Sequence, residues 1–198
     1  MNTIAANSTP ELTAGPSLSR GPVAMAGLII AESAIFTIFI VAYLFYLGKS
    51  LSGPTPQEVL KVPIVNTICL LSSSVTITCA VRALGRGRNL SFGVWWFATM
   101  ALGSYFLFGT GREWMRLIYE KGLTIGTNLF GTTFYSLVGL HASHVIVGLA
   151  ALLVVLALTA CGAVQTAHAK RIEVVAIYWH FVDAIWVVVF TVVYIIGR

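Results

Sequence analysis

The residues of this chain that could do chemistry are a few ionisable side chains inside long apolar stretches. His180 and Asp183 lie about one helical turn apart in the last of these stretches, and His141 and His144 have the same spacing in the one before it. Glu32 lies within the first. Ionisable groups at membrane depth are unfavourable, and they usually face protein rather than lipid. These five side chains therefore say more about function than the apolar residues around them.

Three kinds of site use such residues. A His-x-x-His helix and a His-x-x-Asp helix could converge on zinc or iron, which bind both imidazole and carboxylate. Histidines on facing helices could hold a haem, although such sites usually have matched histidine pairs and the last stretch holds only His180. In the third kind, His180 donates to a carboxylate and a buried hydrogen-bonded network locks the first, fourth and fifth helices together. The spacing favours the network and leaves metal and haem open.

The composition is that of an integral membrane protein. Of the 198 residues, 58% are hydrophobic and only 10% are charged, whereas a soluble domain carries about 25% charged residues. A helix needs roughly 20 apolar residues to cross a bilayer, and five stretches are long enough. We predict an all-α fold, a bundle of five transmembrane helices within residues 22–198. The helices are expected at about residues 23–47, 62–81, 92–111, 128–160 and 172–196.

The first 21 residues are rich in Asn, Ser, Thr, Pro and Gly without periodicity, so we predict a disordered tail. The tail lacks the basic start and apolar core of a cleavable signal peptide. The net charge of +5 does not indicate a nucleic-acid partner, because the basic residues lie in predicted loops. Arg82, Arg86 and Arg88 form the densest group and suit lipid headgroups. Positive residues divide almost evenly between the two sides, and this compact group, free of acids, places the N-terminus in the cytoplasm.

Small and weakly polar residues indicate how the helices pack. Asn66 and Ser73 are seven residues apart in the second stretch and share a face. Gly139, Ser143 and Gly148 give the fourth stretch a face of small residues. Such side chains let membrane helices approach closely and bond across their interface, so we predict that these five residues serve helix packing.

Two further expectations concern aromatic residues and glycines. Trp179 and Trp186 share a face with Asp183, and we expect them to pack against a neighbouring subunit rather than to hold a cofactor. Gly109 and Gly111 permit a kink near the end of the third helix, before a charged interfacial turn.

Two long motifs resemble subunit III of the haem–copper oxidases. Residues 134–148 read Phe-Tyr-Ser-Leu-Val-Gly-Leu-His-Ala-Ser-His-Val-Ile-Val-Gly, similar to that family's Phe-x-x-x-Thr-Gly-x-His-Gly-x-His-Val-x-x-Gly helix. Residues 178–183, Tyr-Trp-His-Phe-Val-Asp, resemble its closing Tyr-Trp-His-Phe-x-Asp. Glu32 falls where the family has a membrane-embedded glutamate, and residues 66–74 match its Asn-Thr…Leu-Leu-x-Ser-Ser segment. The likeness runs from about residue 25 to residue 194.

The chain also departs from the family pattern. Val138 and Ala142 replace a threonine and a glycine of the fourth-helix motif. The mitochondrial type has seven helices, and this chain lacks the first two, so it resembles the five-helix bacterial form. The lipid cleft between the two-helix and five-helix bundles is therefore not expected within this chain, although lipid could fill a groove against subunit I.

The resemblance implies an accessory subunit of a terminal oxidase, of the cytochrome c oxidase type, in a prokaryotic cytoplasmic membrane. Such a subunit is not an enzyme by itself. Catalysis and proton translocation belong to subunit I, and the haem and copper are held by partner subunits. The chain would have no cofactor or metal of its own, would stabilise subunit I during aerobic respiration and would bind phospholipid. This favours the network reading of Glu32, His141, His144, His180 and Asp183.

Other functions remain possible from the sequence. The chain could be subunit III of a quinol oxidase, or the related accessory subunit of nitric oxide reductase, because the motifs would be shared. A different class of protein, a stand-alone membrane metalloenzyme, would use His141, His144, His180 and Asp183 as ligands.

Overall fold

The structure is a computed structural model that describes residues 20–197. Five long helices lie in this range: α1 (Arg20–Tyr46), α3 (Ile64–Gly85), α4 (Asn89–Tyr119), α5 (Leu129–Ala160) and α6 (Ala169–Phe190). A wider π-helical segment, Thr191–Ile196, continues α6, while α2 (Pro56–Val59) and a short 3₁₀ turn, Thr166–His168, lie in loops. All five long helices have the length and apolar composition to cross a membrane, and residues 20–197 contain no strand. The predicted all-α membrane bundle is confirmed.

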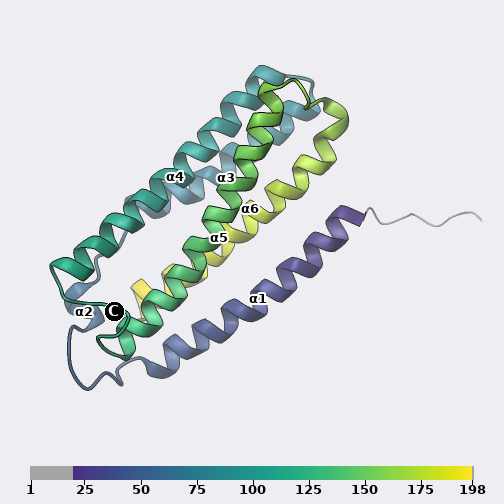
Figure 1. The fold of residues 1–198 in the computed structure, drawn as a ribbon. Helices are drawn as coiled ribbons and strands as arrows, with labels where there is room; N and C mark the ends of the chain where they lie inside the picture. Colours follow the sequence, from purple (N-terminus) through teal and green to yellow (C-terminus); the bar gives the residue numbers. More distant parts are fainter. Residues whose placement is uncertain (1–19, 198) are drawn as a thin grey trace, which may run out of the picture.

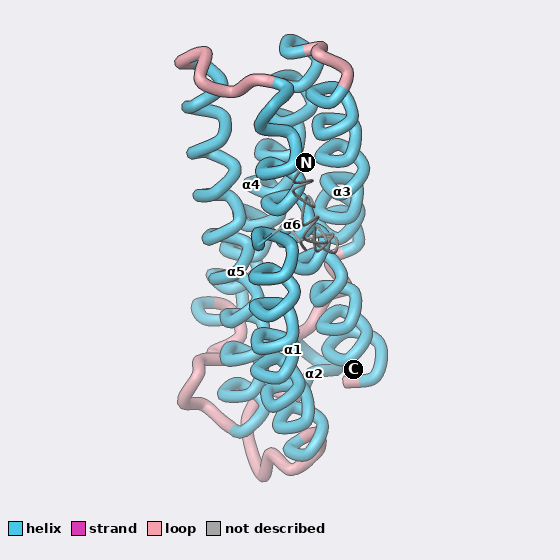
Figure 2. The backbone as a smooth tube through the Cα atoms, turned by 90° about the vertical axis from the view of Figure 1, so that its right-hand side faces the viewer, coloured by secondary structure: helices cyan, strands magenta, loops and turns pink. Residues whose placement is uncertain are grey.

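The helices run along one common axis (Figures 1 and 2). Helices α3, α4, α5 and α6 form a closed ring, in which each packs against the next and α6 packs back on α3. Helix α1 lies outside this ring, against α5 and α6, on the side away from α4. Inside a bilayer the apolar side chains have no water to escape from, so polar and close-packing contacts between helices carry much of the specificity of the ring.

The helix ends differ from the expected ones mainly in α4. This helix continues without a break through Gly109 and Gly111 to Tyr119 instead of ending near residue 111. Arg116 explains the extension, because its guanidinium pairs with Glu113 one turn earlier and donates to the carbonyl oxygen of Val59 at 3.0 Å. The last turns of α4 are thereby fixed to α2. The predicted tail falls largely on residues 1–19, outside the described residues.

The loops at the far end of the bundle, opposite the start of α1, are tied to the helices by side-chain hydrogen bonds. The Asn128 carboxamide accepts from the N–H of Gly131 at 2.8 Å, which caps α5, and donates to the carbonyl oxygens of Ser52 and Pro54. Helix α2 begins at Pro56, between the first two predicted membrane helices. The Thr55 N–H donates to the Glu58 carboxylate at 3.0 Å, and this bond lowers the pKa of Glu58.

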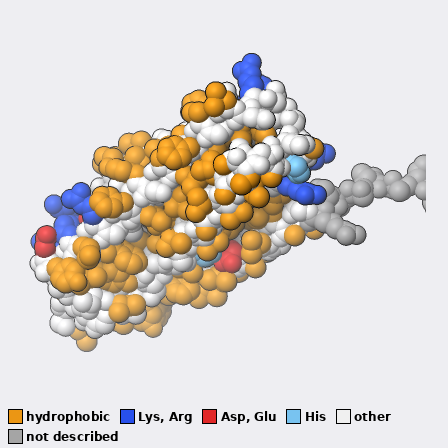
Figure 3. All heavy atoms as spheres, turned by 45° about the horizontal axis from the view of Figure 1, so that its top comes forward, with side chains coloured by type: hydrophobic (Ala, Val, Ile, Leu, Met, Phe, Trp, Pro, Cys, Tyr) orange, Lys and Arg blue, Asp and Glu red, His pale blue; other side chains and the backbone are white. Residues whose placement is uncertain are grey.

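The surface has the distribution expected for a membrane-spanning protein. On the face shown in Figure 3, hydrophobic side chains cover the middle of the molecule and Lys and Arg gather at its two ends. The interior holds the largest aromatic side chains, with Trp96, Trp179 and Trp186 almost completely buried. The expectation that Trp179 and Trp186 face a neighbouring subunit is therefore wrong, because both fill the space between this chain's own helices.

Candidate functional site

The first polar contact at membrane depth joins α1 to α5. His144 Nε2 lies 3.0 Å from Glu32 Oε2, and His144 Nδ1 lies 2.8 Å from the carbonyl oxygen of Leu140. A carbonyl oxygen can only accept, so Nδ1 carries a proton. The contact between Nε2 and Glu32 needs one more proton, which either the imidazole or the carboxyl group holds. This pair is the polar connection between α1 and the ring, and the Phe36 ring packs over it at 5.0 Å from His144.

The second polar group joins α3 to α6. The Ser74 hydroxyl donates to Asp183 Oδ2 and also lies 3.0 Å from His180 Nδ1. His180 Nε2 lies 3.4 Å from Thr78 Oγ1, one turn further along α3. Asp183 is 2% exposed, while His180 is half-buried. Ser74 thus stands between the two ionisable side chains and connects them, where the sequence suggested a direct contact between a histidine and a carboxylate.

Trp179 occupies a slot between three helices. Its indole N–H donates to the Ser73 hydroxyl on α3 at 2.8 Å. Its ring lies against Gly103 of α4 and Gly148 of α5, and a Cβ atom added at either glycine would come within 2.9 Å of the indole. The absence of a side chain at both positions is what admits the ring. The predicted packing residues Ser73 and Gly148 both contact the Trp179 ring, at the point where α3, α4, α5 and α6 meet.

His141 lies apart from both polar groups. It is fully buried, and neither ring nitrogen has a hydrogen-bond partner among the described residues. Its ring centroid is 4.9 Å from that of Trp186 and 5.7 Å from that of Phe106, which meets it edge-on. The five predicted site residues therefore form two separate polar groups and one aromatic contact. They are divided because His144 faces α1, whereas His180 faces α3 on the other side of α6.

The remaining packing residues behave differently from one another. Asn66 packs directly on Gly109 of α4, and Gly139 faces the Trp114 ring, which a Cβ there would touch at 3.4 Å. Ser143 is exposed and donates to the carbonyl oxygen of Leu140 in its own helix. Within the described chain Ser143 thus serves no contact between helices.

The contact between Asn66 and Gly109 allows a paired test. A Cβ at Gly109 would lie 2.1 Å from Asn66 Nδ2, whereas a Cβ at Gly111 would meet nothing within 4 Å. We expect Gly109→Ala to destabilise the chain by about 1–3 kcal/mol, the usual result of overpacking. Gly111→Ala should be neutral or slightly stabilising, because alanine is the better helix former. Unfolding titrations of both variants in mixed micelles measure the difference, and equal stability of the two would exclude the contact.

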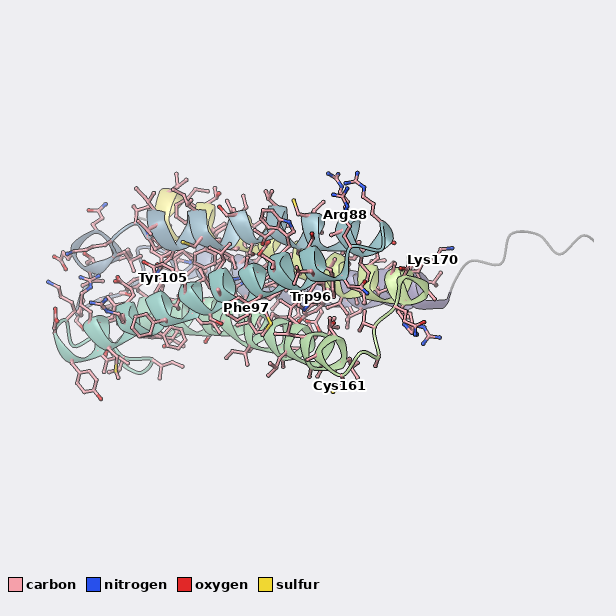
Figure 4. All side chains as sticks on the ribbon, turned by 90° about the horizontal axis from the view of Figure 1, so that it is seen from above. Arg88, Trp96, Phe97, Tyr105, Cys161 and Lys170 are labelled. Atoms are coloured by element: carbon pink, nitrogen blue, oxygen red, sulfur yellow. The ribbon has the colours of Figure 1, made fainter. Side chains whose placement is uncertain are left out.

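The predicted headgroup residues lie at the end of the bundle where α1 begins. The three arginines are exposed at the turn between α3 and α4, and they line a pocket of about 250 Å³ together with Trp95. Arg88 lies at the same end of the molecule as Cys161 and Lys170 (Figure 4). Among the described residues none of the three arginines has an acidic partner in a salt bridge.

The residues that the metalloenzyme alternative would use as ligands do not converge. Across residues 20–197, no three His, Cys, Asp or Glu side chains lie close enough together to hold one ion. Sequence reasoning missed Ser74, Thr78 and Gly103 as members of the site. The hydroxyl side chains of α3 were a usable signal, because Ser74 and Thr78 are four residues apart and lie on one helix face. Gly103 carried no such signal.

Comparison with known proteins places this geometry in a family. Residues 23–198 match the family model described as cytochrome c oxidase subunit III. The cytochrome c oxidase subunit 3 of Synechocystis sp. is 39% identical over 176 residues, which cover 85% of this chain and 72% of that protein. That of Alkalihalophilus pseudofirmus is 33% identical over 168 residues, covering 84% and 82%. The probable cytochrome c oxidase subunit 3 of Nocardia farcinica is 33% identical over 186 residues, covering 91% of each.

The match extends over all five membrane-spanning helices and includes both polar groups and the Trp179 slot. Together with the all-α bundle, it confirms the resemblance seen in the two motifs. The chain belongs to the cytochrome c oxidase subunit III family.

Proposed function

We propose that this chain is a non-catalytic accessory subunit of a bacterial cytochrome c oxidase, which stabilises subunit I and holds no haem, copper or other metal. The observation that carries the proposal is that the ionisable residues make contacts between helices. Glu32 and His144 hold α1 against α5, and His180 and Asp183 are engaged with Ser74 between α3 and α6. These groups are occupied in holding helices together, which is a structural role.

The partners follow from the same proposal. Subunit I and the other oxidase subunits would carry the redox centres and the reaction with oxygen. The relatives are named as cytochrome c oxidase subunits, which favours that complex over the quinol oxidase and nitric oxide reductase alternatives. We place the chain in the cytoplasmic membrane with its N-terminus in the cytoplasm. The α3–α4 turn, with Arg82, Arg86 and Arg88, lies on the side where α1 begins, and cytoplasmic loops are enriched in Lys and Arg.

The absence of a cofactor can be measured directly. We expect the full chain, purified from membranes in which it is expressed alone, to contain no stoichiometric iron, copper or zinc and no haem absorption. Elemental analysis and an optical spectrum provide the measurement. The stand-alone metalloenzyme predicts a stoichiometric metal instead. His141 and His180 do not contact each other, so loss of that metal in both His141→Phe and His180→Phe would show that a metal brings them together as ligands.

Bound phospholipid is the second part of the proposal. The pocket beside Trp95 presents three guanidinium groups that have no acidic partner within residues 20–197, and guanidinium binds phosphate in a bidentate manner. We expect native mass spectrometry of the complex to detect retained anionic phospholipid, and less of it after Arg82, Arg86 and Arg88 are all changed to Gln. The matched control changes Lys49, Lys61 and Lys121 to Gln at the opposite end. Equal lipid retention in the two triple variants would contradict a specific site.

A further inference from the structure

A groove on the outer face of α3 and α6 leads to His180. It has a volume of about 220 Å³. Arg82 and Glu173 line it near the end of the bundle where α1 begins, and Thr78, Ile177 and His180 line the deeper part. Glu173 and His180 are seven residues apart on α6, so the groove spans roughly 10 Å along the helix axis. His180 is therefore reached from the headgroup side although it lies at membrane depth.

Beyond His180 the polar contacts continue inward. His180 Nδ1 is 3.0 Å from Ser74 Oγ, and Ser74 Oγ bonds Asp183 Oδ2. Asp183 Oδ1 is buried without a hydrogen-bond partner among the described residues. The chain of contacts thus starts at an open groove and ends at the Asp183 carboxyl group, of which one oxygen has no partner among the described residues.

The heavy-atom positions of His180, Ser74 and Asp183 allow two proton arrangements. In one, His180 Nδ1–H donates to Ser74 and the Ser74 hydroxyl donates to an Asp183 carboxylate. In the other, a protonated Asp183 donates to Ser74 and the Ser74 hydroxyl donates to His180 Nδ1. The serine hydroxyl has one proton and two lone pairs, so it can donate in either direction while accepting from the other side.

We propose that Asp183 is a proton-binding site that exchanges protons with the aqueous surface through Ser74, His180 and this groove. A proton from water in the groove binds His180 Nε2, the Nδ1 proton passes to Ser74, and the Ser74 proton passes to Asp183 Oδ2. The neutral imidazole changes tautomer, the carboxylate becomes a carboxylic acid, and one hydronium becomes water. The reverse sequence releases the proton. The site would function whether or not the chain is an accessory oxidase subunit.

The residues around Asp183 and the groove support proton transfer through His180 rather than by another route. The charged groups at the groove, Arg82 and Glu173, both lie at its outer end. Glu32, the carboxylate of α1, is engaged by His144 of α5. Val182 and Trp186, the apolar neighbours of Asp183 on its own helix, are almost completely buried. His180 is therefore the connection between Asp183 and water.

Hydrogen–deuterium exchange of a single carboxyl group tests the proposal. The full chain in lipid nanodiscs is transferred from H₂O to D₂O over a range of pH, and the infrared C=O band of protonated Asp183 is identified by its loss in Asp183→Asn. We expect rapid exchange in the unmodified chain. Exchange should be slower by roughly a hundredfold in His180→Phe, because a positioned proton-transfer group typically contributes at least that factor.

Two further variants make the test decisive. Ile177→Trp adds bulk to the groove and keeps every side chain that takes part in the hydrogen bonds, and it should slow the exchange while leaving the band position unchanged. His141→Phe removes a buried histidine that does not line the groove and whose ring nitrogens have no hydrogen-bond partner among the described residues, and it should leave the exchange rate unchanged. Equal rates in the unmodified chain and Ile177→Trp would overturn the route. The absence of an Asp183 carboxylic acid band at every pH at which the chain stays folded would overturn the site.

Discussion

Replacing Trp179 by alanine should destabilise the helix bundle by about 3–5 kcal/mol, the range measured when large buried aromatic side chains are truncated. The indole is completely buried, and it fills the slot that Gly103 and Gly148 leave open between α4 and α5. Its removal leaves a cavity at the meeting point of four helices and removes the hydrogen bond that the Ser73 hydroxyl accepts, while the bond from Ser73 to the carbonyl oxygen of Leu70 remains. No neighbouring side chain can replace both the volume and the N–H group.

The measurement is the free energy of unfolding of the purified chain in mixed micelles. Trp95→Ala is the matched control, because Trp95 is 42% exposed on the surface of α4 and its truncation should have a much smaller effect. Trp179→Phe should fall between the two, since it keeps most of the ring volume and loses the bond to Ser73. If Trp179→Ala and Trp95→Ala are equally stable, the slot does not hold the bundle together.

The second large effect is expected at Asp183. In Asp183→Ala the Ser74 hydroxyl loses its buried acceptor, which typically destabilises by about 1–3 kcal/mol, and a cavity adds to this. Asp183→Asn keeps an oxygen that can accept from Ser74 in nearly the same position. We therefore expect Asp183→Ala to weaken the packing of α3 against α6 more than Asp183→Asn does. Assembly with subunit I should be weakened in the same order.

Subunit stoichiometry of the affinity-purified complex measures this difference. A fair comparison expresses both variants at equal levels and includes Ala184→Ser, a change at the exposed position next to Asp183. Equal loss of the chain from the Asp183→Ala and Asp183→Asn complexes would mean that the hydrogen bond to Ser74 has no part in assembly.

The sequence was sufficient to predict that the fold is all-α and that five helices have the length and apolar composition to cross a membrane. Both follow from the length of apolar stretches, which the bilayer thickness determines. It was also sufficient to recognise the family, because the motifs around His141 and His180 keep residue types in a fixed order. The helix periodicity put Asn66 and Ser73 on one face of their helix, and in the structure Asn66 lies against Gly109 and Ser73 accepts from Trp179.

The pairing of the helices could not be predicted in the same way. Spacing along one helix indicates which residues share a face, but it does not indicate which helix that face meets. His141 and His144 are a single turn apart, yet the first packs between Phe106 and Trp186 while the second bonds Glu32 of α1. The slot for Trp179 was missed because Gly103 and Gly148, which receive its ring, lie on different helices and meet only in the folded bundle.

The most direct test of the accessory role is oxygen uptake by the purified oxidase complex. Complexes that carry the unmodified chain, Asp183→Asn or Asp183→Ala are compared at equal haem content, from the first turnovers until activity declines. We expect the same initial rate of oxygen uptake in all three complexes, because the reaction takes place in another subunit. The Asp183→Ala complex should lose activity earlier during sustained turnover, because this chain stabilises that subunit. A fully assembled Asp183→Ala complex with no initial activity would contradict the account.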